Sequence, residues 1–262
     1  MNRERLASIR DMVRKTYSDT EVVSRYAHIG LWPAEEILVL EYFPDNAQVL
    51  DLGCGAGRTT IPMAEMGLKV VGIDFSPSMI QMAQELAEVS NVEPDLQVMD
   101  AMDLKFADSN FDIALFSYNG LELLPGVEGK KRALREIHRV LKPGGLFVFC
   151  AHSPFALNQF AFMRVTTFIK FVLGRLFSLP IQERELGERF STDPEEEVKY
   201  LQILPPFIIK QLLLDCRFEL EYFNTRNRIE KGHKWRWPAI FADGERFYIA
   251  RKTSESGVDA DK

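Results

Sequence analysis

The stretch VLDLGCGAG, residues 49–57, constrains the fold more than any other part of the chain. Val49, Leu50 and Leu52 are typical of the end of a buried strand, and glycines follow at every second position before a helical pattern begins. Glycine permits a positive φ and has no Cβ to hold a ligand away from the backbone. A strand, a glycine turn and a helix in this order predict the nucleotide-binding start of a doubly wound α/β sheet.

The next predicted strand ends in an acidic side chain whose position suits a nucleoside. Apolar residues alternate through residues 68–73 and stop at Asp74, about 20 positions after Gly53. A carboxylate there can accept hydrogen bonds from both ribose hydroxyls. Asp74 could instead cap the helix that starts at Pro77, but Ser76, directly before the proline, suits that role better. The sequence therefore favours a ribose-binding carboxylate.

The glycine spacing argues against a dinucleotide. The pattern G-x-G-x-x-G needs a glycine where this chain has Arg58, and the third glycine, Gly57, comes one residue early. This weakens the case for a pyrophosphate held at the helix N-terminus. The spacing favours a cofactor with an adenosine and a short charged tail.

Four further segments complete a family pattern: VVGIDFSPSMI at 70–80, VMDAMDL at 98–104, FDIALFSYNGLELL at 111–124 and RVLKPGGLFVF at 139–149. With VLDLGCGAG they resemble, in order and spacing, the motifs of the small-molecule type of class I S-adenosylmethionine (SAM) dependent methyltransferases. The resemblance implies a Rossmann-like, doubly wound, seven-stranded sheet that is mostly parallel with an antiparallel last strand. It also implies SAM as the cofactor and S-adenosyl-L-homocysteine as the product.

The same resemblance, carried over position by position, implies a cofactor site at the ends of successive strands. The implied residues are Asp51 at the ammonium end, Gly53 and Gly55 beside the methionine part, Asp74 on the ribose, Phe75 and Met79 against the adenine, Asp100 at the adenine amino group, Ala101 beside it, and Ser117. Asp103 lies close to Asp100 in the sequence, and either Asp100 or Asp103 could be an ordinary loop residue.

Candidate catalytic residues follow from their expected nearness to the methyl group. Alignment of the reactants alone can contribute roughly 7 to 11 kcal/mol, so a base is optional. His152 ends a predicted strand at the cofactor edge, and a histidine is the expected base near neutral pH. It could instead be a hydrogen-bonded strand-end residue. His233 in a long loop is a second candidate, and family position places Tyr118 beside the methyl group.

Alternating strand and helix patterns predict one α/β sheet with additions. The predicted strands span 47–52, 68–73, 95–99, 111–117, 145–151, 217–223 and 245–251, and the main helices 58–66, 77–89, 128–141 and 206–215. The expected organisation is N-terminal helices capping the cleft (1–44), a SAM-binding core (45–152), an insertion (153–204), completion of the sheet (205–252) and a disordered tail (253–262).

The insertion at 153–204 is too long for an ordinary connection, and segments of that size are usually functional. Phenylalanines between Phe155 and Phe177 are interleaved with Arg164, Lys170 and Arg175. Three readings stay open: a helix packed on the domain, a substrate lid, or an amphipathic helix on a membrane surface. The basic residues argue against a stable transmembrane segment. The loop 226–244, with His233, Trp235 and Trp237, could wall the substrate pocket or cover the sheet edge.

Composition narrows the class of partners. The chain has 262 residues, a formal net charge of −6 and no sustained basic stripe, so we expect no nucleic-acid partner. The motif SYNG at 117–120 departs from the Asn/Asp-Pro-Pro-Tyr type of nucleic-acid amino methyltransferases, which also counts against a DNA base. Three cysteines without metal-ligand spacing, and a start without an apolar signal core, predict a cytoplasmic protein with no metal. We expect a monomer or homodimer.

The sequence thus predicts transfer of a methyl group from SAM to an N, O or C atom of a small molecule. The phenylalanine-rich insertion suggests an acceptor with an aromatic or apolar body. Methylation of a protein or peptide, and a SAM-binding regulatory protein without turnover, remain open because all three need the same carboxylates. A nicotinamide dehydrogenase is disfavoured by the glycine spacing.

Overall fold

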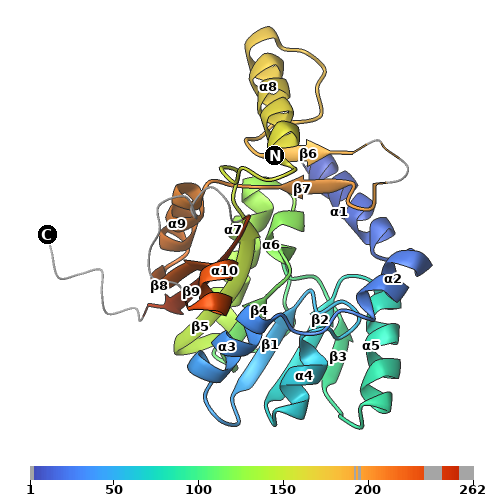
Figure 1. Ribbon diagram of the computed structural model, residues 1–262, viewed down its shortest axis with the longest axis vertical. Coiled ribbons are helices and arrows are strands. Elements are labelled where there is room, and N and C mark those ends of the chain that lie inside the picture. The colour runs from blue at the N-terminus through green and yellow to red at the C-terminus, as the bar shows by residue number, and fades with distance from the viewer. Residues whose placement is uncertain (1–2, 192, 194–195, 233–243, 254–262) are drawn as a thin grey trace, which may run out of the picture.

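The computed structural model describes residues 3–191, 193, 196–232 and 244–253, and a seven-stranded sheet forms its centre (Figure 1). The strands are β1 (Gln48–Leu52), β2 (Lys69–Asp74), β3 (Asp95–Val98), β4 (Phe111–Phe116), β5 (Leu141–His152), β8 (Phe218–Thr225) and β9 (Glu245–Lys252), in the order β3-β2-β1-β4-β5-β9-β8. The first five strands pair in parallel, whereas β9 is antiparallel to both β5 and β8. The predicted fold class is confirmed.

Alternate strand residues supply two hydrophobic cores, one on each face of the sheet. Leu50, Phe147 and Phe149 pack with helices α7 (Gly126–Val140) and α9 (Pro206–Asp215). Their neighbours Val49 and Val148 pack with α3 (Pro33–Tyr42), α4 (Thr60–Glu65) and α10 (Arg226–Lys231) on the other face. Burial on both faces explains why these strands have nearly continuous apolar sequences.

Helix α5 (Pro77–Val89) lies beside α4 and packs against β2 and β3 (Figure 1). Its bounds, like those of α9, match the prediction, and its N-cap is Ser76, whose hydroxyl accepts a hydrogen bond from the Met79 amide. This confirms that Ser76, and not Asp74, caps the helix. Strand β5 begins at Leu141, earlier than the predicted start at residue 145, because the segment around Gly144 and Gly145 continues the strand with a register irregularity against β4.

Two helices precede the sheet domain. The predicted amphipathic helix is α1 (Arg3–Thr16), and α2 (Thr20–Tyr26), which was not predicted, follows it directly. Asp19 caps α2, because its carboxylate accepts hydrogen bonds from the amides of Glu21 and Val22. Both helices lie toward the carboxyl ends of the parallel strands (Figure 1).

The insertion forms helix α8 (Ala161–Phe177) and a small hairpin of β6 (Glu188–Phe190) and β7 (Tyr200–Gln202). Its helical signals predicted α8 but not the hairpin. Helix α8 projects from the body of the molecule beyond this hairpin (Figure 1). None of the described helices is long and apolar enough to cross a membrane.

The expectation of an irregular loop over 226–244 was wrong at its start, where residues 226–231 form α10 directly after β8. Ile229 of this helix packs into the core beneath α3, which gives the segment an apolar anchor. His233, Trp235 and Trp237 lie outside the described residues.

Candidate active site

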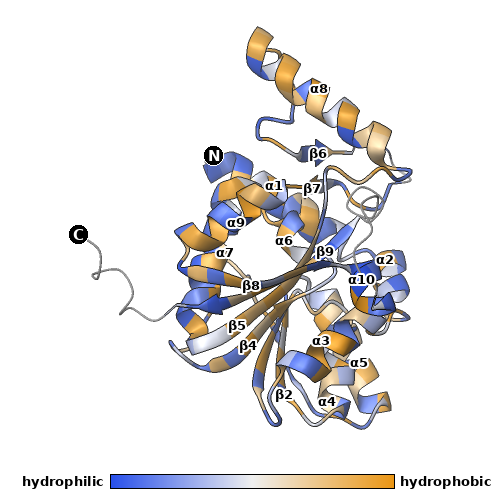
Figure 2. Ribbon diagram, turned by 60° about the vertical axis from the view of Figure 1, so that its left-hand side comes forward, coloured by the Kyte–Doolittle hydropathy of each residue, from blue (hydrophilic) through white to orange (hydrophobic). Residues whose placement is uncertain are grey.

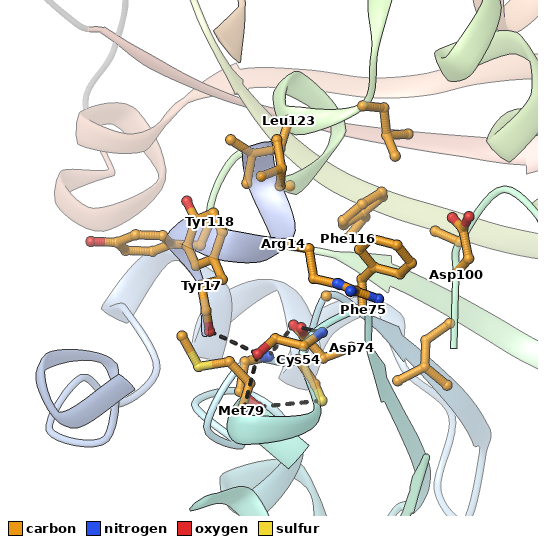
Figure 3. A pocket seen from close by; sticks show the side chains of 18 of the residues that line it. Arg14, Tyr17, Cys54, Asp74, Phe75, Met79, Asp100, Phe116, Tyr118 and Leu123 are labelled. Carbon is orange, nitrogen blue, oxygen red and sulfur yellow. Dashed lines mark hydrogen bonds between the residues drawn. The ribbon is translucent and has the colours of Figure 1, made fainter. Parts of the chain in front are cut away.

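A cavity opens at the carboxyl edge of the parallel strands and brings most of the predicted residues together (Figure 3). The residues that directly follow strands β1, β2, β3 and β4 line this cavity, and side chains of helix α1 cover it. The predicted residues in the lining are Gly53, Gly55, Asp74, Phe75, Met79, Asp100, Ala101, Ser117 and Tyr118. Of the predicted residues that the structure describes, Asp51 and His152 do not line the cavity.

The glycine turn leaves backbone exposed to this cavity. Gly53 and Gly55 have φ values of 62° and 56°, in the left-handed region that disfavours side chains. A Cβ on Gly55 would meet only Met79 and Tyr26, each at 3.9 Å, so the space in front of it is cavity and not packed core. The turn therefore forms a cradle that a ligand can approach closely.

Asp74 stands at the end of β2 and already holds the turn in place. Its Oδ2 accepts a hydrogen bond from the Gly55 amide at 3.0 Å, and Oδ1 accepts one from the Ser76 amide at 2.8 Å. Burial raises the pKa of Asp74 to about 6, against the effect of these backbone donors. Each carboxylate oxygen retains a lone pair, so the group can also accept hydroxyl donors from a ligand.

Asp51 lies behind the turn, fully buried. Its Oδ2 accepts hydrogen bonds from the hydroxyls of Thr59 and Thr60 at 2.5 and 2.6 Å, and Thr59 lines the cavity. Its Oδ1 has no hydrogen-bond partner among the residues that the structure describes. Burial raises the pKa of Asp51 to about 6. A buried carboxylate with an unpaired oxygen can accept a further donor or a positive charge.

At the other end of the cavity, α1 meets two of the four residues predicted for the adenine, Phe75 and Asp100. Arg10 forms an ion pair with Asp100, and its guanidinium carbon lies 5.0 Å from the centre of the Phe75 ring. Arg14 also approaches this ring, at 5.8 Å. The sequence reasoning missed both arginines, since no local pattern connects them to Asp100. The positions of Phe75, Asp100 and Arg14 are shown in Figure 3.

A buried ion pair supports the floor of the site. Arg58 donates to Glu35 at 2.5 and 2.8 Å and to the Ser117 hydroxyl at 3.0 Å, and Ser117 in turn donates to Glu35. Burial alone would lower the pKa of Arg58, but the hydrogen bonds to Glu35 and the negative charge of Glu35 together have the larger effect and raise it. Arg58, which stands where the dinucleotide pattern has a glycine, is therefore part of a buried hydrogen-bond network. In this network Ser117 forms hydrogen bonds with two charged side chains, those of Arg58 and Glu35.

Tyr118 extends the cavity away from Phe75 and Asp100. Its φ of 48° and that of Asn119, 63°, are unusual for residues with side chains and commonly mark functional sites. The Tyr118 ring centre lies 5.0 Å from Trp32 and 5.5 Å from Tyr26, and the Arg58 guanidinium lies 4.9 Å from it. The result is an aromatic surface with a cation at its side.

His152 ends β5 close to this surface and is paired with a carboxylate. Its Nδ1 lies 2.7 Å from Oε2 of Glu122, and its backbone amide donates to Oε1 of Glu122 at 2.7 Å. Burial of the ring works against protonation, but the Glu122 carboxylate outweighs it and raises the pKa of His152. With Nδ1 engaged, Nε2 is left facing Asn119 at 3.5 Å. Glu122 was not predicted from the sequence.

The arrangement fits SAM on the structure's own features. The cradle at Gly55 can admit the methionine part, the buried carboxylate of Asp51 can balance an ammonium, and Asp74 can accept ribose hydroxyls. Phe75 and Asp100 offer a ring face and an acceptor for adenine at the far end of the same cavity.

Comparison with known proteins identifies the family. Residues 49–145 match the model of a methyltransferase domain. A demethylmenaquinone methyltransferase of Staphylococcus aureus is 31% identical over 207 residues, which cover 76% of this chain and 83% of that protein. A putative methyltransferase of Bacillus subtilis, YqeM, is 34% identical over 117 residues, and the chain spans only 47% of its length.

A solved structure shares the fold. A SAM-dependent methyltransferase of Methanosarcina mazei superposes with a TM-score of 0.68 at 24% identity, covering 87% of this chain and 100% of that one. With the sequence match to the Staphylococcus enzyme, the motifs and the cavity, this gives the family assignment. The chain belongs to the class I methyltransferases, enzymes whose methyl donor is S-adenosyl-L-methionine.

Proposed function

We propose that this enzyme methylates an N, O or C atom of a small molecule with an aromatic or apolar body. One observation carries the proposal: Tyr26 and Tyr118 line the same cavity as Asp74 and Asp100. An aromatic surface therefore continues directly from the cofactor carboxylates. Ring faces stack on planar or apolar groups and supply little that would select a polar peptide backbone.

The name of the Staphylococcus relative supports an acceptor of this kind, since demethylmenaquinone combines an aromatic ring system with an apolar body. We take a reduced quinone as the first acceptor to test. The cysteines Cys54, Cys150 and Cys216 are free and buried, which supports a reducing compartment such as the cytoplasm as the place of action.

The proposed cofactor contacts are those of the sequence prediction. Asp74 accepts the ribose hydroxyls, Phe75 and Asp100 receive the adenine, and Gly53 and Gly55 border the methionine part. Asp51 acts from behind Thr59, as a buried negative charge that favours the ammonium. SAM, when bound, supplies an electrophilic methyl group.

His152 is the proposed proton acceptor. Glu122 accepts a hydrogen bond from Nδ1 and so holds the ring with Nε2 facing Asn119, next to Tyr118 of the cavity lining, where Nε2 can take a proton. Tyr118 provides the stacking surface that aligns the acceptor, and alignment supplies the larger part of the rate. His233 stays a further candidate outside the described residues.

The test is transfer of a labelled methyl group from SAM to demethylmenaquinol and to a panel of hydroxylated arenes and peptides. We expect label in an aromatic small molecule and none in peptides; label only in peptides would refute the proposal. His152→Ala should lose turnover and keep its SAM affinity in calorimetry. His28→Ala, which changes an exposed histidine, is the matched control and should keep full activity.

A further inference from the structure

Helix α8 presents most of its large apolar residues to solvent and buries Thr167 against the protein. Phe162, Val165, Ile169, Leu173 and Leu176 are all exposed, at the spacing of a single helical face. Thr167, by contrast, is buried against the molecule. Figure 2 shows this apolar helix standing away from the sheet domain. Single apolar residues are common on protein surfaces, but a continuous exposed apolar face such as this one marks an interaction site.

The charges around this face point to an anionic partner. Residues 153–181 contain three basic residues, Arg164, Lys170 and Arg175, and no aspartate or glutamate, in a chain whose formal net charge is −6. On a helical projection Lys170 and Arg175 lie on opposite sides of the apolar face, and both are exposed. Lys170 approaches Glu183, a buried carboxylate outside the helix, at 3.7 Å, while its own side chain stays 58% exposed.

The distribution of charge also argues against self-association through α8. Two copies of this helix placed face to face would bring like charges together, with no carboxylate on either helix to pair with them. A bilayer that contains anionic lipid meets both requirements, because its acyl region accepts the apolar residues and its headgroups accept the flanking cations. Basic residues interrupt the apolar sequence of α8, and none of the described helices qualifies as a span, so the helix suits the plane of the interface.

The location of α8 relates this face to the cavity. The insertion leaves β5 at the carboxyl edge of the sheet, where the cavity opens, yet none of its described residues lines that cavity. The helix is therefore free to contact a surface without losing packing at the site.

We propose that the exposed face of α8 docks this enzyme on the surface of membranes that contain anionic lipid. Phe162 and Leu176 are the main apolar anchors, and Arg175 and Lys170 contact the headgroups. The proposal concerns a surface separate from the catalytic cavity, and it holds whichever acceptor is methylated.

The test is flotation of the full chain with vesicles of phosphatidylcholine alone or with about 30% phosphatidylglycerol. We expect binding to the anionic vesicles, at least about tenfold weaker in the double variant Phe162→Ser, Leu176→Ser. The matched control is Leu40→Ser, Phe207→Ser, which changes one leucine and one phenylalanine that are 70% and 65% exposed on α3 and α9, against 70% and 79% on α8. This control should bind like the unaltered chain.

Two further measurements separate the outcomes. Arg175→Glu should weaken binding to anionic vesicles and leave the far-ultraviolet circular dichroism unchanged. Hydrogen exchange of residues 161–177 should slow when anionic vesicles are added. Absence of vesicle binding by the unaltered chain would overturn the proposal, as would equal losses in both double variants. A dimer that dissociates on Phe162→Ser, Leu176→Ser without vesicle binding would assign the face to a second copy instead.

Discussion

Asp51 should make the protein less stable as the pH rises, and Asp51→Asn should remove that dependence. The carboxylate is buried, and burial moves its pKa from 3.8 to about 6. Below pH 3.8 both the folded and the unfolded chain keep this proton. Between 3.8 and 6 the unfolded chain releases it first, so the free energy of unfolding falls as the pH rises. Above pH 6 the full cost, about 3 kcal/mol, is present.

The asparagine variant is suited to this measurement because its amide oxygen can still accept hydrogen bonds from Thr59 and Thr60. Any pH-independent cost of burying the new amide nitrogen cancels when the variant is compared with the unaltered chain at two pH values. The difference in unfolding free energy should move in favour of the variant by about 1.5 kcal/mol between pH 5 and pH 8.

Urea unfolding followed by circular dichroism over this pH range gives the quantity directly. Asp103→Asn is the control, because the hydrogen bond from Lys105 lowers the pKa of Asp103 below its ordinary value of 3.8. Asp103 is therefore ionised in the folded and the unfolded chain throughout this range, and the difference for Asp103→Asn should stay flat from pH 5 to pH 8. A difference for Asp51→Asn that stays flat from pH 5 to pH 8 would refute the reasoning. It would mean that the buried carboxylate is ionised over the whole range, as it is in the unfolded chain.

Three further predictions concern the site. Gly55→Ala and Gly67→Ala both place a side chain at positive φ and should each cost about 1 kcal/mol of stability, but only the former should weaken SAM binding, by roughly tenfold in calorimetry; equal losses would contradict the cradle. Asp74→Ala should weaken SAM binding by on the order of a hundredfold, and unchanged affinity in the folded variant would remove its ribose role. Glu122→Gln should lower the pKa of His152, as measured in an NMR titration. The Glu122–His152 pair stabilises the fold below pH 6.5, the ordinary pKa of histidine, and this stabilisation is lost as the pH rises; the variant should lack it. An unaltered pKa of His152 would exclude the pairing.

The fold was predictable because its signals are local. Strand β1 and the glycine turn are read from nine consecutive residues, and α5 from the Ser76-Pro77 start and its helical periodicity. The hairpin of β6 and β7 was missed because three-residue strands give too short a pattern. Helix α10 was missed because its stability depends on one apolar residue, Ile229, inserted into a distant core.

The site likewise contains residues that the sequence predicts and contacts that it does not. The carboxylate at the end of β2 could be predicted, since strand ends and motif spacing are sequence properties. The pairing of Arg10 with Asp100 joins residues 90 positions apart, and Glu122 reaches His152 across 30. Neither contact has a local pattern; each follows from how helices rest on the finished sheet.

The contact of α1 with Phe75 and Asp100 bears on exchange of the cofactor. Arg10 contacts both Phe75 and Asp100, the two side chains that are expected to receive the adenine. The adenine of the cofactor and the guanidinium of Arg10 would therefore compete for these two side chains. The same helix is tied to the insertion, because Arg5 pairs with Glu188 of β6 at 2.7 Å. Helix α1 therefore contacts both the cavity and the segment that carries α8. If docking of α8 moved α1, it would change the affinity for SAM, and SAM would then change the affinity for the docking surface by the same factor.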